Sequence, residues 1–415
     1  MVSLCNLWWE NVAFCDILCQ QASTHYTAHL LSTRKGALVK ILTNLPVSKV
    51  EGISNTFLPF ADFVTSQNKK VEIIGVNFAQ STRKKVAFST QVRGCLRLIT
   101  YGMPLPGIAS VVESSRGIDD IAVAYEALIS QFRKLISKEK PNLILINGTY
   151  FVPWCLNIAA SEYDIPKILH YHGILTKETE TWDKTKRDIF RAMERAFDNK
   201  KTMYIFPSLL AKNTVEKEVY GHKVKNFAVL PNPVPLHFFD VTKKGNRKKV
   251  GVVSRWAAVK NSKFSKKLAK YNYKKGKVLS INIITNHNID RRSKEELSKL
   301  AKLRRPMDNG KLAKFYEEMG CVISPSHFET YGNVAQEAIA ANTPALVSEN
   351  MGVAETFRAL GLDDWIIDFS SVKHVYDKIR SVSDAGVPDI VREKMKAQFS
   401  TPVIHNQLLA LLNIM

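Results

Sequence analysis

The sequence has few cysteines, no long apolar run and fewer acidic than basic residues. Six cysteines in 415 residues are too few for a disulfide framework, so we expect free thiols in a reducing cytoplasm. Cys15 and Cys19 are spaced like neighbours on one helix face, but no histidine or cysteine cluster completes a metal site, and we expect none. No apolar run reaches the roughly 18 residues that a membrane span requires. The start also lacks the basic segment and cleavage site of a signal peptide, so a cytoplasmic location is expected.

The shortage of acidic residues is concentrated in one segment. The whole chain has 59 lysines and arginines against 38 acids, a net charge of +21. Residues 241–314 hold 23 of the basic residues and four of the acids. Such a basic block suits a phosphate-rich partner, or an anionic membrane on which the protein would be peripheral. The run YNYKKGK within it equally fits a lysine-rich solvated face, and the sequence leaves both interpretations open.

The first half of the chain alternates short apolar runs with helical periodicity. Helices are predicted over residues 55–68, 118–140 and 177–198. Strands are predicted at ALVKILT (37–43), VEIIGVNF (71–78), PNLILING (141–148), IPKILHYHG (165–173) and KTMYIFPS (201–208). Strands that are apolar throughout and alternate with helices are typical of a parallel sheet covered on both faces.

The same alternation restarts after a proline-rich break, LPNPVPLHFFD (230–240), so we predict two Rossmann-like domains of the α/β class facing across a cleft. Ligands of open α/β sheets bind at the carboxyl ends of the strands, which is where chemistry should be sought. The predicted organisation is an N-terminal extension (1–36), an N-terminal Rossmann-like domain (37–232), a linker (233–247), a C-terminal Rossmann-like domain (248–390) and a C-terminal helix that packs back on the first domain (391–415).

The stretch FETYGNVAQEAIAANTP (328–344) carries two glutamates around a glycine turn. We expect Asn333 to cap a helix that runs through Ala340. A helix start after a glycine offers N–H groups and a positive dipole end to a phosphate. Glu329 and Glu337 flank that start, and carboxylates accept hydrogen bonds from sugar hydroxyls. The stretch therefore predicts a nucleotide-sugar site, although a first-turn glutamate plus a surface glutamate would give the same pattern.

Three further elements place polar residues near predicted strand ends. SRWAAVKN sets Arg255 and Lys260 just past the strand KKVGVV, where two cations could stabilise a leaving diphosphate. HYHG sets His170 and His172 at the end of another strand. Gly52, before the first helix, would let backbone approach a ligand. Each also has a structural explanation: membership of the basic block, a structural histidine, or an ordinary turn glycine.

Taken in order, these elements resemble the retaining glycosyltransferases of the GT-B fold in family 4, the glycosyl transferases group 1. The resemblance covers about residues 37–400. Its most specific part is the pair of glutamates separated by seven residues in PSHFETYGNVAQEAIAANTP. The runs VGVVSRWAAVKN, VLPNPV and HYHG and the Gly52 loop supply the other four elements.

On the donor side, the resemblance implies that Arg255 and Lys260 hold the diphosphate of a nucleotide sugar. Glu337 would accept from the ribose hydroxyls, and Glu329 would hold the donor sugar. The cations would replace a metal ion, so no tightly bound cofactor is implied; a UDP- or GDP-sugar would be the donor substrate. Backbone contacts to sugar and phosphate would come from Tyr331, Gly332, Asn333 and Val334.

On the acceptor side, the resemblance places His172 against the sugar at the reacting side and brings Gly52 near the phosphates and acceptor. It implies transfer of a hexose-type sugar with retention to a hydroxyl of a glycan, a lipid-linked acceptor or a small molecule. The alternatives are transfer to modified bases in DNA, and a non-catalytic relative that binds a polyanion or a nucleotide sugar. The fold alone leaves an epimerase or a phosphorylase open as well.

Overall fold

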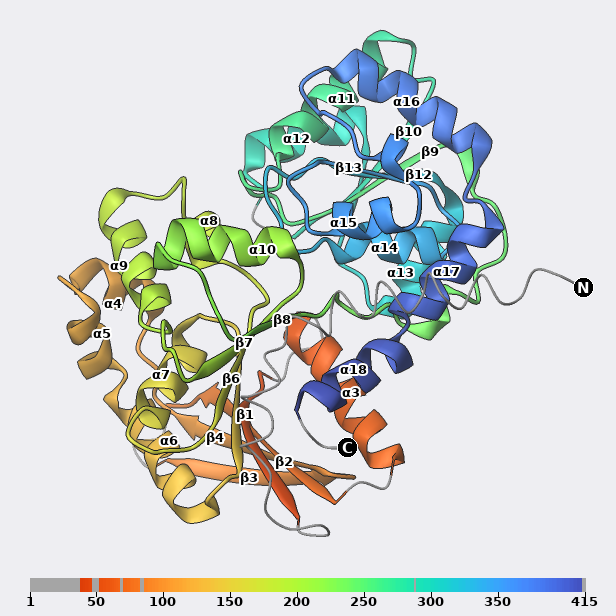
Figure 1. Ribbon diagram of the computed structural model, residues 1–415. Helices are drawn as coiled ribbons and strands as arrows, with labels where there is room; N and C mark the ends of the chain where they lie inside the picture. The colour runs from red at the N-terminus through yellow and green to blue at the C-terminus, as the bar shows by residue number, and fades with distance from the viewer. Residues whose placement is uncertain (1–37, 47–51, 68–69, 83–85, 287–288, 413–415) are drawn as a thin grey trace, which may run out of the picture. The chain divides into compact units, whose positions relative to one another are not determined.

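The computed structural model describes residues 38–46, 52–67, 70–82, 86–286 and 289–412 (Figure 1). The predicted N-terminal extension, residues 1–36, lies outside this part of the chain. The described chain forms two compact units. Unit 1 comprises residues up to Pro207, Lys212–Leu230 and the chain from His405, and unit 2 comprises Ser208–Ala211 and Pro231–Ile404. The domain boundaries predicted from the sequence remain a prediction.

Unit 1 is built on an eight-stranded sheet in the order β3-β4-β2-β1-β5-β6-β7-β8. All neighbouring strands are parallel except β3, which pairs antiparallel with β4 at the edge. Every residue of β5, β6 and β7 is buried, as expected where helices cover both faces. The strands are β1 (Val39–Asn44), β2 (Val71–Gln80), β3 (Ala87–Arg93), β4 (Leu96–Met103), β5 (Leu143–Asn147), β6 (Lys167–His170), β7 (Thr202–Phe206) and β8 (Phe227–Val229).

Two helix predictions in this unit are wrong in extent. The single helix expected over 118–140 is two helices that meet at Tyr125, whose buried ring stacks on Phe151 at 5.1 Å between centroids. The helix expected over 177–198 is likewise divided, because Asp183 caps a new start by accepting from the Lys186 N–H at 3.0 Å. The helices that lie wholly or partly in this unit are α3 (Gly52–Ser66), α4 (Ile108–Ser114), α5 (Ile118–Ala124), α6 (Glu126–Glu139), α7 (Phe151–Ala160), α8 (Leu175–Glu178), α9 (Lys184–Arg195), α10 (Leu209–Thr214), a π-helical turn (Val215–Tyr220) and α18 (Thr401–Leu411).

Unit 2 has a five-stranded, wholly parallel sheet in the order β11-β10-β9-β12-β13. The strands are β9 (Asn246–Val253), β10 (Ser280–Ile284), β11 (Lys302–Arg304), β12 (Met319–Ser324) and β13 (Ala345–Val347). The helices are α11 (Ser262–Lys274), α12 (Arg291–Leu300), α13 (Asn309–Glu318), α14 (Asn333–Ala340), α15 (Val353–Ala359), α16 (Val372–Ala385) and α17 (Asp389–Phe399). The proline-rich segment also packs here, with Val234 and Phe238 fully buried in the unit's core.

Both sheets confirm the predicted α/β class, and both reverse their strand order at one point. In unit 1, β1 lies between β2 and β5; in unit 2, β9 lies between β10 and β12. Ligands of open α/β sheets bind beyond the carboxyl ends of the strands at such a reversal. Among the described residues, no helix is both long and apolar enough to cross a membrane.

Candidate active site

In unit 2, the loops after β9 and β12 bring a predicted cation and a predicted carboxylate together. Lys260 Nζ lies 3.1 Å from Glu329 Oε1, and the two side chains are 17% and 20% exposed. Ser326 Oγ donates to the same carboxylate oxygen at 2.6 Å. The loops are also joined through the backbone, since the His327 N–H donates to the Val259 carbonyl at 2.8 Å. The strand reversal at β9 and β12 thus holds a positive and a negative group at one position.

The helix that follows Glu329 begins as a phosphate-binding helix would, but with a different cap from the predicted one. Gly332, not Asn333, precedes the first residue of α14, and no described side chain caps that helix. The Asn333 side chain instead accepts from Asn232 Nδ2 at 2.7 Å. Gly332 has a φ of +123°, and a Cβ there would lie 2.7 Å from Met351 Cε. The first-turn N–H groups of α14 therefore follow a position that only glycine fits easily.

Tyr331 and Val334 support this turn by packing. The Tyr331 ring is buried, and its hydroxyl donates to Gln336 Oε1 at 3.0 Å and lies 2.8 Å from Thr356 Oγ1. Val334 is half-buried against the unit's core. The Tyr331 side chain is therefore held inside the unit, and a ligand contact by its backbone remains a prediction.

Glu337 lies in the second turn of α14 and receives a hydrogen bond from the Tyr316 hydroxyl at 3.1 Å. Burial raises the pKa of the Glu337 carboxyl from 4.5 to about 7, and the Tyr316 hydrogen bond opposes part of that rise. The carboxyl is therefore only partly ionised at neutral pH. Arg255, two residues beyond the end of β9, has an exposed side chain, and its part in binding remains a prediction.

In unit 1, the two strand-end histidines lie against each other. The ring centroids of His170 and His172 are 4.2 Å apart. His172 Nε2 lies 3.2 Å from Asn147 Oδ1. Burial lowers the pKa of both imidazoles, that of His172 to about 4. Both rings are therefore neutral at pH 7, which suits hydrogen bonding better than charge stabilisation.

A buried asparagine pair, which the sequence analysis missed, links these histidines to the strand reversal. Asn44 ends β1, and its Nδ2 donates to the Asn147 carbonyl at 2.9 Å; the Asn147 N–H donates to Asn44 Oδ1 at 2.9 Å. Asn147 Nδ2 donates to Thr43 Oγ1 at 2.8 Å. The signal in the sequence was a polar residue directly ending each of two apolar strands.

A second missed residue is the buried Glu194 of α9. Its carboxylate accepts from the Leu175 and Thr176 N–H groups, both at 2.9 Å, and from Thr149 Oγ1 at 3.3 Å. Desolvation raises the pKa of Glu194 to about 7 despite these donors. Because Thr149 follows β5 and Leu175 follows the His172 loop, Glu194 connects the two loops at the candidate site.

Gly52 is the first residue of α3, and the five residues before it lie outside the described chain, so its approach to a ligand remains a prediction. The described residues contain no group of three or more His, Cys, Asp or Glu that could hold a metal ion.

Comparison with known families gives two matches that follow one another along the chain. Residues 106–238 match the model of Glycosyltransferase Family 4, and residues 234–399 match the model of Glycosyl transferases group 1. Together they run without a gap over most of the 415 residues. A search of curated proteins found no match.

Solved structures share the fold at low sequence identity. Sucrose-phosphate synthase from Thermosynechococcus elongatus is 12% identical with a TM-score of 0.67, over 90% of this chain and 98% of that one. An α,α-trehalose-phosphate synthase (UDP-forming) from Burkholderia xenovorans, in complex with glucose-6-phosphate, is 11% identical with a TM-score of 0.58, over 90% and 100%. An E. coli trehalose-6-phosphate structure bound with UDP-2-fluoro glucose is 10% identical with a TM-score of 0.61, over 90% and 98%.

The likeness to these structures confirms the GT-B fold, and the two family matches confirm the family expected from the motifs. The chain belongs to family 4 of the glycosyltransferases, the glycosyl transferases group 1, and is a retaining enzyme that takes its sugar from a nucleotide-diphosphate donor.

Proposed function

We propose that the enzyme transfers a hexose-type sugar from a UDP- or GDP-sugar to the hydroxyl of a glycan, a lipid-linked acceptor or a small molecule. The observation that carries the proposal is the Lys260–Glu329 pair, held at 3.1 Å just before the start of α14. One position thus offers a cation, a hydroxyl acceptor and a positive helix end. A diphosphate joined to a sugar needs that combination.

On the donor side, Lys260 and Arg255 bind the diphosphate, and Lys260 exchanges its contact with Glu329 for a phosphate oxygen. Glu329 then accepts from a sugar hydroxyl, while the backbone from Tyr331 to Val334 approaches sugar and phosphate. Glu337 accepts from the ribose hydroxyls. Fixed cations favour the charge that develops on the leaving diphosphate, which is commonly a large part of catalysis.

On the acceptor side, neutral His172 lies at the reacting side of the sugar, oriented by Asn147. The acceptor oxygen forms the new bond to the anomeric carbon, the bond from that carbon to the diphosphate breaks, and the hydroxyl proton leaves with the nucleoside diphosphate. Attack and departure occur on one face of the sugar. The Gly52 loop contributes to the acceptor side, and no metal ion is required by this scheme.

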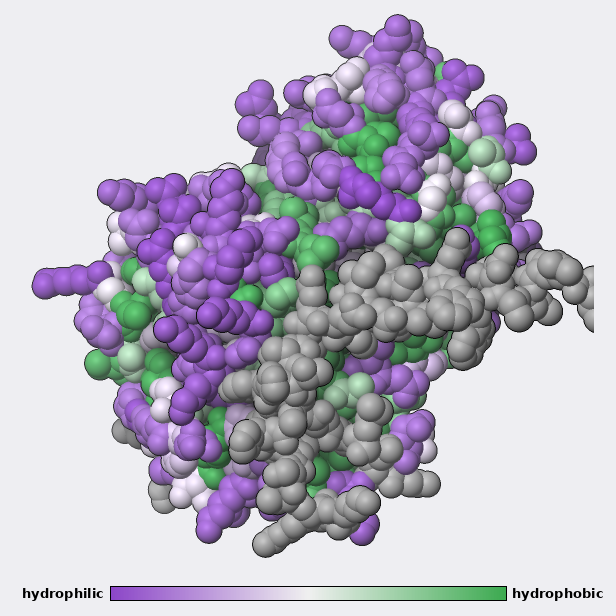
Figure 2. All heavy atoms as spheres, in the orientation of Figure 1, coloured by the Kyte–Doolittle hydropathy of each residue, from purple (hydrophilic) through white to green (hydrophobic). Residues whose placement is uncertain are grey.

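The basic block supplies the finer proposal of a peripheral cytoplasmic location at an anionic membrane. Hydrophilic side chains cover the outer surface of α11 and α12 (Figure 2). The Glu296 carboxylate there forms ion pairs with both Lys266 and Lys270. One negative charge thus faces two positive charges, and this part of the surface remains basic. Transfer to modified bases in DNA, or polyanion binding without catalysis, would use the same surface and is the alternative.

A thermal-shift screen tests the donor assignment. UDP, GDP, ADP and TDP, and their glucose, mannose, galactose and N-acetylglucosamine forms, are each added near 100 times a plausible dissociation constant, which stabilises a binding protein by roughly 2.7 kcal/mol. We expect a shift with one base series. A folded protein that none of these ligands shifts would refute the donor site and favour the polyanion-binding alternative. Glucose-6-phosphate, present in the B. xenovorans complex, should be included as a candidate acceptor.

A further inference from the structure

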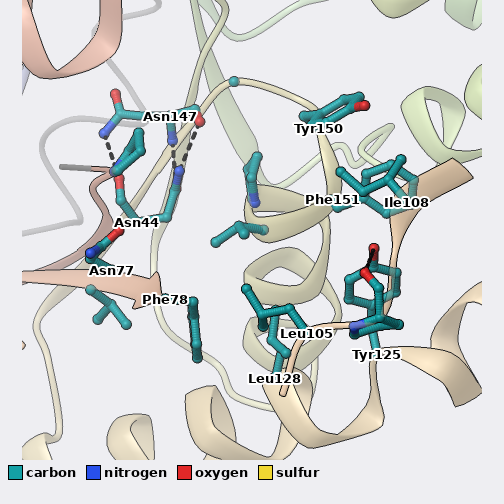
Figure 3. Close-up of a pocket in the computed structure, with 16 residues that line it drawn as sticks. Asn44, Asn77, Phe78, Leu105, Ile108, Tyr125, Leu128, Asn147, Tyr150 and Phe151 are labelled. Carbon is teal, nitrogen blue, oxygen red and sulfur yellow. Dashed lines mark hydrogen bonds between the residues drawn. The ribbon is translucent and has the colours of Figure 1, made fainter. Parts of the chain in front are cut away.

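Unit 1 contains a pocket of about 380 Å³ at the carboxyl ends of β1 and β5 and beside residues 76–78 of β2 (Figure 3). It lies at the sheet's strand reversal, where ligands of open α/β sheets bind. Small-molecule sites commonly measure about 300–1,000 Å³. A cavity of about 150 Å³ is enough for one benzene ring, so this pocket has room for a ligand of about two rings.

The two sides of the pocket differ in chemistry, as Figure 3 shows. Asn44 and Asn147 lie on one side, joined by their mutual hydrogen bonds. Ile108, Tyr125 and Phe151 lie on the other, with the Tyr125 and Phe151 rings stacked. A mostly apolar cavity with a few fixed amides suits an apolar body that carries one or two hydroxyls.

Charge excludes another class of ligand. None of the described residues that line the pocket is charged. A phosphate group would have to leave water without a lysine or arginine among these residues to replace its hydration, which is costly. The pocket therefore disfavours a sugar phosphate and favours an uncharged molecule.

The polar side of the pocket is adjacent to His172, the residue proposed for the reacting side of the sugar. Asn147 lines the pocket and its Oδ1 lies 3.2 Å from His172 Nε2. A hydroxyl that contacts the asparagine side is thus one residue away from His172. The Tyr125 hydroxyl donates to the Pro106 carbonyl at 3.4 Å.

We propose that this pocket binds the apolar body of the acceptor, and that the acceptor is an uncharged phenol or alcohol whose hydroxyl is carried by one or two rings. The inference rests on the proposed function, because it names the acceptor class of that reaction. It narrows the glycan, lipid-linked or small-molecule acceptors to a cyclic, apolar small molecule.

Binding of 2-naphthol, measured by calorimetry on the full-length protein, tests the inference without turnover. Ile108 lines the pocket and is 39% exposed, so the Ile108→Asp variant should fold. The short aspartate side chain would keep its carboxylate close to the apolar ligand, which weakens ligand binding. Val123 is 78% exposed and does not line the pocket, so Val123→Asp is the matched control. We expect Ile108→Asp to weaken 2-naphthol binding at least about tenfold and Val123→Asp to leave it unchanged.

Two results would overturn the inference: no binding of 2-naphthol by a wild-type protein that binds glucose-6-phosphate instead, or equal binding by both variants. The nucleotide screen decides the proposed function separately. If a nucleotide series shifts the melting temperature but 2-naphthol does not bind, the acceptor class is wrong and the donor site stands. If 2-naphthol binds in the pocket but no nucleotide shifts the protein, the proposed function is wrong.

Discussion

Replacing Gly332 by alanine should destabilise unit 2 and disturb the start of α14. Its φ of +123° is a conformation that L-residues rarely adopt, and the added Cβ would lie 2.7 Å from Met351 Cε and 3.0 Å from Val353 Cγ1. Backbone strain of this kind costs roughly 1–3 kcal/mol, and overpacking adds about 1–3 kcal/mol. Met351 can move its terminal methyl, so we expect a loss near the lower end of the sum, about 3 kcal/mol.

The control is Gly361→Ala in the same unit. Gly361 has a φ of +74°, but a Cβ there meets nothing within 4 Å, so the loss should be about 1–2 kcal/mol. For a unit of this size, about 3 kcal/mol lowers the melting temperature by roughly 6–12 °C. Differential scanning calorimetry of both variants measures the difference, and titration with the nucleotide that shifts the wild type measures donor affinity.

We expect Gly332→Ala to melt several degrees below Gly361→Ala and to bind the nucleotide more weakly, because the first-turn N–H groups of α14 move. Equal melting temperatures would show that Met351 and Val353 accommodate the methyl group. Unchanged nucleotide affinity in a clearly destabilised variant would refute the assignment of this helix start to the donor.

The remaining predictions concern charged groups. Lys260→Ala should lower the rate of nucleotide diphosphate release by at least about a hundredfold, while Lys263→Ala, an exposed lysine on α11, should retain the rate in the same coupled assay. Donor affinity should rise from pH 6 to pH 8 as the Glu337 carboxyl, whose pKa is about 7, ionises; calorimetry of Glu337→Gln should show weaker binding that no longer changes over this range. Folding raises the pKa of Glu194 from 4.5 to about 7, so its stabilising contribution is present below pH 4.5 and is lost as pH rises through 7. Urea titrations should therefore show wild type losing about 3 kcal/mol relative to Glu194→Gln between pH 5 and pH 8, and parallel pH curves would contradict this.

The strands of both sheets were predictable where burial on two faces gives a continuous apolar run. PNLILING contains β5, and every residue of that strand is buried. The β3–β4 hairpin was missed because β3 is an exposed edge strand without an apolar pattern. Its one local signal was Gly94, which has a φ of +55° between Arg93 and Leu96, a directly paired couple. Glycine in a two-residue loop is a known hairpin signal.

The candidate site was predictable where one loop carries several chemical groups, and less so where strands bring single residues together. The Glu329–Glu337 stretch is recognisable from the sequence alone. The structure adds the contact between Lys260 and Glu329. Asn44 and Asn147 are 103 residues apart, and neither stands in a motif. The two asparagines are neighbours because β1 pairs with β5 in one particular register. A single sequence does not show which strands pair or in which register.

The two strand reversals collect opposite kinds of chemistry. The one in unit 2 gathers a lysine, two carboxyls and the positive end of a helix, all of which act on charge and hydroxyls. The one in unit 1 gathers neutral histidines, asparagine amides and an uncharged pocket. We have proposed that the nucleotide diphosphate binds at the first and an apolar ring at the second. If each unit selects its ligand by this difference, exchanging the pocket residues should change the acceptor without changing the donor.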